Sequence, residues 1–102
     1  MSISEKSKVT FSDFKDLDVA KYLDSHEMMA EFLNDCFEDG DANLDLAALS
    51  SVARAKGMAE VARKTGLGRE SLYTALSPGA QPRFETIRKI IAALDLKVKI
   101  TA

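Results

Sequence analysis

The stretch EVARKTGLGRESLYTALS, residues 60–77, constrains the fold more than any other part of the chain. Its helical pattern is interrupted once, by a Gly-Leu-Gly triplet that begins at Gly66, and it resumes immediately afterwards. Ala62 is small enough for two helices to cross closely, and Gly66 can adopt the positive φ of a sharp turn. Leu72 can anchor the second helix inward. The pattern therefore predicts a helix-turn-helix over residues 58–76.

The second of these helices should carry its polar side chains on the outside. Placing Leu72, Ala75 and Leu76 inward leaves five polar residues to project outward, namely Arg69, Glu70, Ser71, Tyr73 and Thr74. A helix over residues 69–76 is about 12 Å long, short enough to enter the major groove of DNA end first. The sequence thus predicts a DNA-reading helix. A helical hairpin whose glycines serve only packing is the alternative.

Each outward side chain has a role that its chemistry allows. Arg69 can make a bidentate contact to guanine, while Ser71 and Thr74 can hydrogen-bond base edges or phosphate. Tyr73 offers a hydroxyl to the backbone or an apolar face to a thymine methyl. Glu70 repels phosphate, so it either accepts from a cytosine amino group or holds Arg69 in place. These two roles of Glu70 stay open.

Cations near the motif are candidates to hold the DNA backbone. Lys64 ends the first helix, and Arg83 follows the turn cluster SPGAQP of residues 77–82. Arg88 is a further candidate, although charges on a helix face are often only solvated. The charge distribution supports a polyanionic partner, because residues 52–102 carry ten basic and four acidic residues. Residues 1–51 carry twelve acidic residues against four lysines, which suits a basic partner or a solvated acidic face.

The rest of the chain predicts an all-α domain with short, irregular ends. Residues 1–17 are polar and expected to be loosely ordered, and residues 18–95 form the helical domain. Three longer helices are predicted, the first capped by Ser25 and ending near Glu38, the second over 43–56 and the third over 84–94. Within them, Met28 and Phe37 are expected on a buried stripe of the first helix, and Phe84 on that of the last.

The segment 96–102 has a different periodicity. Leu96, Val98 and Ile100 alternate with two lysines, which predicts a short β-strand. An isolated strand leaves its backbone groups unpaired, so this one should pair with a copy of itself across a two-fold axis. A strand of another protein, or the segment 9–11, is the alternative partner.

Other classes of function find little support in the residues. His26 is the one histidine and lacks metal-ligand spacing, no phosphate-cradling glycine loop is present, and no serine stands in a nucleophile elbow. We therefore expect neither catalysis nor a metal or other cofactor. The lone Cys36 lies on a helical pattern between apolar residues, which indicates a buried thiol. No apolar run is long enough to span a bilayer, and a cytoplasmic protein is expected.

Residues 52–94, VARAKGMAEVARKTGLGRESLYTALSPGAQPRFETIRKIIAAL, resemble the lambda-repressor-type (Xre) helix-turn-helix. With YLDS at 22–25 and EDGD at 38–41, the chain resembles addiction-module antidote proteins, the HigA-like antitoxins paired with RelE/HigB-like toxins. The resemblance covers about residues 18–101. It implies a five-helix DNA-binding core with an N-terminal helical extension, a homodimer, neutralisation of a ribonuclease toxin, and repression of the shared operon.

The resemblance also suggests roles for particular residues. It places Arg69, Glu70, Ser71, Tyr73 and Thr74 on base-reading positions. Arg83 departs from the pattern, since such repressors often have Ser or Thr there as an N-cap, and this favours a phosphate contact. Toxins of this class are generally basic, so an acidic set could cover one: Asp24, Glu27, Glu31, Asp35 and Glu38. The C-terminal strand or the first residues could equally be the toxin contact.

Two other functions remain compatible with the sequence. A stand-alone Xre-type transcriptional repressor would use the same helix-turn-helix without a toxin partner. A protein-binding module would use the acidic helices as its interface and bind no particular DNA.

Overall fold

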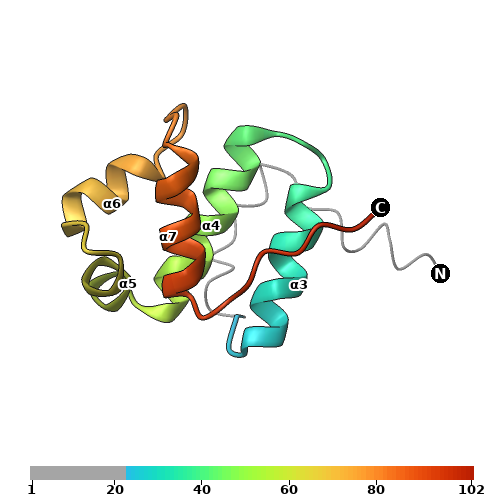
Figure 1. The fold of residues 1–102 in the computed structure, drawn as a ribbon, viewed down its shortest axis with the longest axis horizontal. Helices are drawn as coiled ribbons and strands as arrows, with labels where there is room; N and C mark the ends of the chain where they lie inside the picture. Colours follow the sequence, from blue (N-terminus) through green and yellow to red (C-terminus); the bar gives the residue numbers. More distant parts are fainter. Residues whose placement is uncertain (1–22) are drawn as a thin grey trace.

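The computed structural model describes residues 23–102. This part of the chain forms five α-helices in sequence (Figure 1), α3 (His26–Phe37), α4 (Ala42–Lys56), α5 (Met58–Thr65), α6 (Arg69–Ala75) and α7 (Phe84–Ala93). The all-α prediction is confirmed for these residues. The loosely ordered segment predicted for residues 1–17 lies outside the described part. Between residues 23 and 102, no helix combines the length and the apolar character needed to cross a membrane.

Helix α3 begins and ends where its local signals indicate. The hydroxyl of Ser25 accepts a hydrogen bond from the backbone N–H of Met28 at 3.1 Å, which satisfies one of the free amides of the first turn. The helix ends at Phe37, close to the prediction. The buried stripe is narrower than predicted, because Met28 and Phe37 are exposed. Only Met29, Leu33 and Cys36 are buried, and the two flanking side chains lie at its edges.

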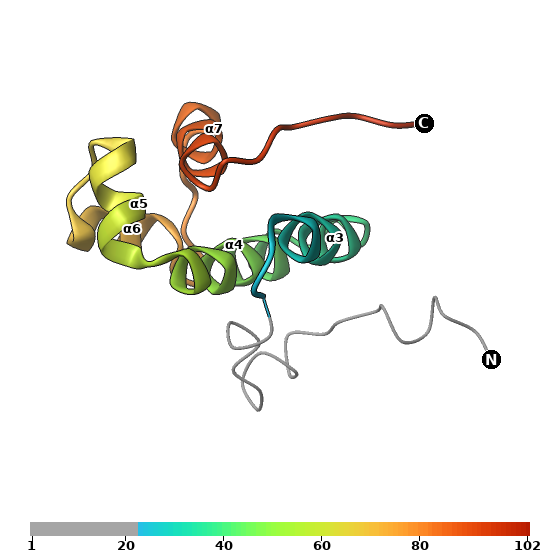
Figure 2. The same cartoon turned by 90° about the horizontal axis from the view of Figure 1, so that it is seen from below.

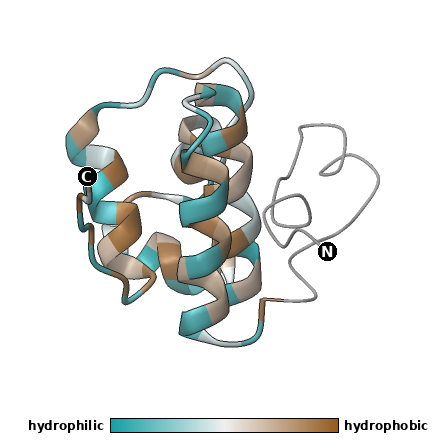
Figure 3. Cartoon of the chain, turned by 90° about the vertical axis from the view of Figure 1, so that its right-hand side faces the viewer, coloured by the Kyte–Doolittle hydropathy of each residue, from teal (hydrophilic) through white to brown (hydrophobic). Residues whose placement is uncertain are grey.

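Helix α4 forms the centre of the fold. The carboxylate of Asp41 accepts hydrogen bonds from the backbone N–H groups of Asn43 at 2.9 Å and Leu44 at 3.3 Å. The helix packs against both α3 and α5, which lie to either side of it (Figure 2). It contributes more buried residues than any other described helix, and apolar residues of the described helices gather on their facing sides (Figure 3). A single core thus joins the acidic and the basic parts of the chain.

Helix α7 packs on α5 and buries Ile90 and Ala93, but its first residue points away from the core. The prediction that Phe84 is buried was wrong, since 71% of its surface is exposed. As the first residue of the helix, Phe84 extends past the buried stripe. Its ring instead lies under the guanidinium of Arg88, whose central carbon is 5.7 Å from the ring centroid.

Residues 96–102 form no strand in this structure, so the predicted C-terminal strand needs correction. Asp95 has a φ of 62° and closes α7, and the N–H of Leu96 donates to the carbonyl of Ile91 at 3.3 Å. Beyond Leu96 the chain makes no backbone hydrogen bond to another backbone group of the described part. A strand requires such a neighbour. The segment instead crosses over α3 (Figures 1 and 2).

Candidate nucleic-acid interface

The turn between α5 and α6 has the geometry predicted from its glycines. Gly66 has a φ of 79° in the left-handed region, and its N–H donates to the carbonyl of Ala62 at 3.1 Å. A Cβ at this position would meet no atom within 4 Å, so the backbone angle rather than space favours glycine. Leu67 packs partly against the core, and the hydroxyl of Thr65 accepts from its N–H at 3.2 Å. The turn therefore fixes the angle at which α6 leaves the domain.

Helix α6 is anchored by one side and open on the other. Leu72 is completely buried, and Leu76 just after the helix is buried as well. All five of the predicted outward residues are exposed, namely Arg69, Glu70, Ser71, Tyr73 and Thr74. Arg69 and Glu70 form no ion pair in the described part of the chain, so here Glu70 does not hold Arg69 in place. The second role of Glu70, accepting from a base, stays a prediction.

The cations of residues 55–94 fall into two groups. The three lysines, Lys56, Lys64 and Lys89, all form ion pairs with carboxylates of neighbouring residues or helices. The four arginines in this range form no ion pair with any residue of the described part, and they are Arg63, Arg69, Arg83 and Arg88. An arginine without a carboxylate partner can meet a phosphate or a base without first breaking an intramolecular ion pair. This separation could not be seen in the sequence.

Lys64, one of the predicted phosphate contacts, is held by two ion pairs. Its ammonium lies 3.3 Å from a carboxylate oxygen of Glu60 and 3.5 Å from one of Asp95. The same Asp95 oxygen accepts from Lys56 at 2.9 Å and lies 3.8 Å from Nε2 of His26. Asp95 therefore ties the beginning of α3 and the ends of α4 and α5 to the end of α7. Sequence reasoning missed this residue because its partners are far away along the chain.

The Asp95 network predicts a pH dependence. The hydrogen bond from Lys56, followed by the charges of Lys56 and Lys64, holds the pKa of the Asp95 carboxyl below its usual 3.8. Its stabilising effect is thus present above pH 3.8 and lost as the pH falls through the lowered pKa. We expect the Asp95→Asn variant to lose less of its free energy of unfolding than wild type below pH 3.8, measured by urea unfolding. Asn is a suitable replacement because it tolerates the positive φ of this position. Parallel curves of unfolding free energy against pH for the two proteins would contradict the network.

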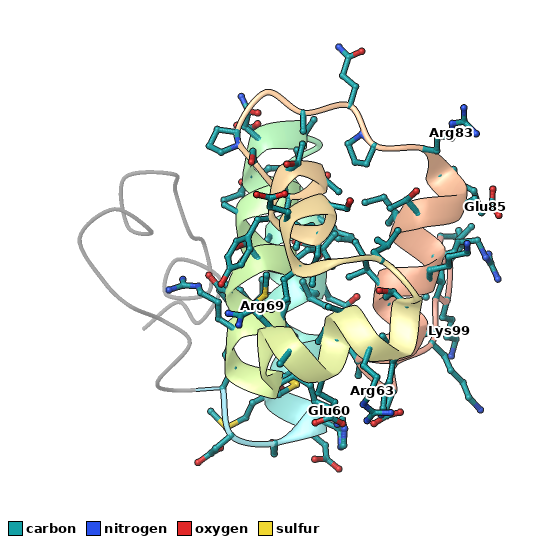
Figure 4. The ribbon with its side chains drawn as sticks, turned by 90° about the vertical axis from the view of Figure 1, so that its left-hand side faces the viewer. Glu60, Arg63, Arg69, Arg83, Glu85 and Lys99 are labelled. Atoms are coloured by element: carbon teal, nitrogen blue, oxygen red, sulfur yellow. The ribbon has the colours of Figure 1, made fainter. Side chains whose placement is uncertain are left out.

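Three of the arginines without ion pairs in the described part lie around the exposed side of the helix-turn-helix. Figure 4 looks onto α5 and α6 and shows Arg69 at the start of α6, Arg63 on α5 below it, and Arg83 at the start of α7. Arg83 occupies the N-cap position of α7 without a side-chain capping bond, so its side chain serves no cap. Arg63 was not among the residues singled out from the sequence. The arrangement presents separate positive groups around one short polar helix.

The acidic residues of the predicted toxin-binding set lie at the other end of the described part. Helices α3 and α6 are at opposite ends of the described part in both views (Figures 1 and 2). Four members of the predicted toxin set are exposed there, and they are Asp24, Glu27, Glu31 and Glu38, while Asp35 is half-buried. These acidic residues are therefore separated in space from the arginines of α5 and α6, although Lys97 and Lys99 of the basic half also lie beside α3. One end of the domain can attract a polyanion while the other attracts a cationic surface.

Cys36, the single thiol of the chain, is not placed for nucleophilic chemistry. It is fully buried, and burial, followed by the charge of Asp35, raises its thiol pKa to about 12. A thiol with this pKa stays protonated at neutral pH and is a poor nucleophile. In the described residues, no group of three or more His, Cys, Asp or Glu side chains is placed to hold a metal ion.

Comparisons with known proteins agree with the antidote resemblance. The profile of a family described as "Probable addiction module antidote protein" matches residues 13–102. A protein of Haemophilus influenzae (strain ATCC 51907 / DSM 11121 / KW20 / Rd), described as uncharacterized, is 41% identical over 86 residues. These cover 84% of this chain and 89% of the relative. No solved structure shows significant similarity to the chain.

Proposed function

The chain belongs to the family of probable addiction module antidote proteins, and on this premise we propose that it is a DNA-binding antitoxin of a type II toxin–antitoxin module. In this role it neutralises a RelE/HigB-like ribonuclease toxin and represses its own operon through an Xre-type helix-turn-helix. The observation that carries the DNA-binding part is the exposed polar face of α6. A helix of this length, about 10 Å, fits end first into a groove about 12 Å wide.

The residue roles follow from exposure and from the pairing of charges. Arg69 begins α6 without an ion-pair partner in the described chain, so it is the residue we assign to a guanine. Ser71, Tyr73 and Thr74 share its exposed face, and Glu70 accepts from a cytosine amino group. Arg83 and Arg88 contact phosphates. Lys64 can do so only by leaving Glu60 and Asp95, and we therefore rank it below the arginines.

A palindromic operator requires two copies of the reading helix. We propose a homodimer in which the two α6 helices are about 34 Å apart, one turn of DNA, with residues Leu96, Val98 and Ile100 in the interface. The toxin binds at the opposite end, on the acidic face of α3 formed by Asp24, Glu27, Glu31 and Asp35. Both partners can then be bound together, because the two surfaces do not overlap.

Neutralising Arg83 tests the phosphate assignment. We expect Arg83→Gln to weaken binding by similar factors on operator and unrelated DNA. The slope of log K against log salt should become shallower by about 0.9 for each phosphate that is no longer neutralised, thus by nearly two for both half-sites. Binding titrations at four salt concentrations measure this slope. Lys89→Gln is the control, because Lys89 already pairs with Glu85 at 3.7 Å and should change the slope less. An unchanged slope for Arg83→Gln removes this residue from the phosphate set.

Co-expression tests the antitoxin role itself. The neighbouring gene of the operon is expressed alone and together with this chain, and growth and co-purification are measured. We expect growth arrest from the neighbour alone, rescue by this chain, and a stable complex. Absence of both rescue and complex, with operator binding retained, would instead identify a stand-alone transcriptional repressor. Equal affinity for its own promoter and for unrelated DNA would remove the repressor role.

A further inference from the structure

A groove runs between α3 and the segment 96–101, and we call it the α3–tail groove. Its volume is about 540 Å³, within the range of ligand-sized pockets. One wall is formed by α3, with Leu33, Phe37 and Glu38, and the other by the tail, with Lys97 and Val98. Figures 1 and 2 show the tail passing over α3 along this course. None of the residues assigned to DNA contacts lines this groove.

The apolar residues of the groove are only partly covered. Phe37 is 37% and Val98 50% exposed, although the periodicities of both segments favour burial. Leu96 and Ile91 are half-buried on the core at the inner end of the groove. Exposed apolar surface that lines a hollow on both sides favours an occupant. Two of the departures from the sequence prediction, at Phe37 and at the tail, therefore share one location.

The charges of the groove are separated by wall. Glu38 stands on the α3 wall, while Lys97 and Lys99 stand on the tail. None of these three forms an ion pair with a residue of the described chain. The backbone of the tail beyond Leu96 also lacks backbone partners there. The groove thus offers a tail backbone without backbone partners, apolar walls and the carboxylate of Glu38 on one side. These features suit an extended segment that alternates apolar and basic residues.

The tail itself has this pattern, Leu96-Lys97-Val98-Lys99-Ile100. We propose that the α3–tail groove of each copy is filled by the tail of a second copy, in an antiparallel pair about a two-fold axis. Apolar residues of the entering tail then pack on Phe37, and its lysines reach Glu38 of the copy they enter. A two-fold axis makes the contact reciprocal, so both grooves are filled at once.

The position of Glu38 beside the groove favours such a pairing. In an antiparallel pair centred on Val98, Lys97 of one copy lies opposite Lys99 of the other, and like charges directly opposite destabilise a strand pair. Glu38 beside the groove offsets this repulsion. The inference specifies the interface of the proposed homodimer and rests on that dimer. It reserves Glu38 for self-association and leaves Asp24, Glu27, Glu31 and Asp35 for a different partner.

Charge reversal tests the pairing. Two variants, Glu38→Lys and the double variant Lys97→Glu/Lys99→Glu, are compared with wild type by light scattering across a dilution series. The dimer dissociation constant of each variant alone should rise roughly tenfold or more, because each groove then brings like charges together. An equimolar mixture of the two variants should restore dimers, because in the mixed dimer each groove and the tail that enters it carry opposite charges. Glu27→Lys is the control, because Glu27 lies on α3 outside the groove and should leave self-association unchanged.

Several outcomes would overturn the inference. They are a monomeric wild type, variants that dimerise as wild type does, a mixture that stays monomeric, and a Glu27→Lys effect equal to that of Glu38→Lys. Circular dichroism of each variant shows whether it is folded. If these substitutions leave dimerisation and operator binding unchanged, the groove is not the dimer interface, but the proposed function still stands. Variants that lose only the co-expressed toxin would assign the groove to the toxin instead.

Discussion

Replacing Arg69 with alanine should weaken binding to the operator by about 1 to 3 kcal/mol per half-site, the value of one good bidentate contact to a base. Arg69 is exposed at the first position of α6 and has no ion-pair partner in the described chain. Its loss should therefore remove the proposed DNA contact without breaking an ion pair inside the protein. Fluorescence anisotropy at one fixed salt concentration, with operator and unrelated duplexes, measures the effect.

The comparison between the two duplexes decides the role of Arg69. A base contact is made on the operator only. The affinity for unrelated DNA should therefore fall by no more than the removal of one positive charge causes. Arg63→Ala provides the matched control, because it removes an equally unpaired arginine from the adjacent helix α5. Equal losses for Arg69→Ala on both duplexes would show a backbone contact and would reject base reading at this position.

Replacing Leu72 with alanine should have the largest effect on stability. Leu72 is fully buried and anchors α6, and large-to-small substitutions of buried leucine typically cost about 2 to 5 kcal/mol. In a domain whose total free energy of unfolding is about 5 to 15 kcal/mol, this is a large fraction. Urea unfolding followed by circular dichroism measures the difference. The variant should bind the operator poorly wherever the fold is partly lost.

The neighbouring residue supplies the control for Leu72. Tyr73 is 45% exposed on the same helix, and Tyr73→Ala should change the free energy of unfolding by much less. The two variants therefore separate the inward from the outward side of α6. A cost below about 1 kcal/mol for Leu72→Ala, or a larger cost for Tyr73→Ala, would mean that the helix faces the other way.

Local signals predicted the parts of the fold that depend on nearby residues. The Ser25 cap, the positive φ of Gly66 and the inward position of Leu72 each follow from residues close by in the sequence. The exposed set on α6 then followed by geometry, since a helix with one buried side leaves the rest outside. The candidate site was therefore readable once the turn at Gly66 had been recognised.

The remaining features depend on contacts between distant residues. Lys64 looked like a free cation until α7 brought Asp95 within 3.5 Å of it, across 31 positions of sequence. Phe84 continued an apolar pattern, but the core ends before the first turn of α7. The tail has the periodicity of a strand, yet periodicity supplies no neighbouring backbone. Periodic patterns alone determine neither the extent of a core nor the partner of a strand.

A substitution cycle between Arg69 and the operator guanines tests the central claim most directly. Each guanine is replaced in turn by 7-deazaguanine, which lacks the N7 acceptor in the major groove, and binding of wild type and of Arg69→Ala is measured. We predict one symmetry-related pair of guanines at which the replacement lowers the affinity of wild type. The same replacement should leave the affinity of Arg69→Ala unchanged, because the arginine is already absent. Losses of the same size in both proteins at every guanine would show that Arg69 contacts no guanine N7, and would contradict the base-reading role proposed for Arg69.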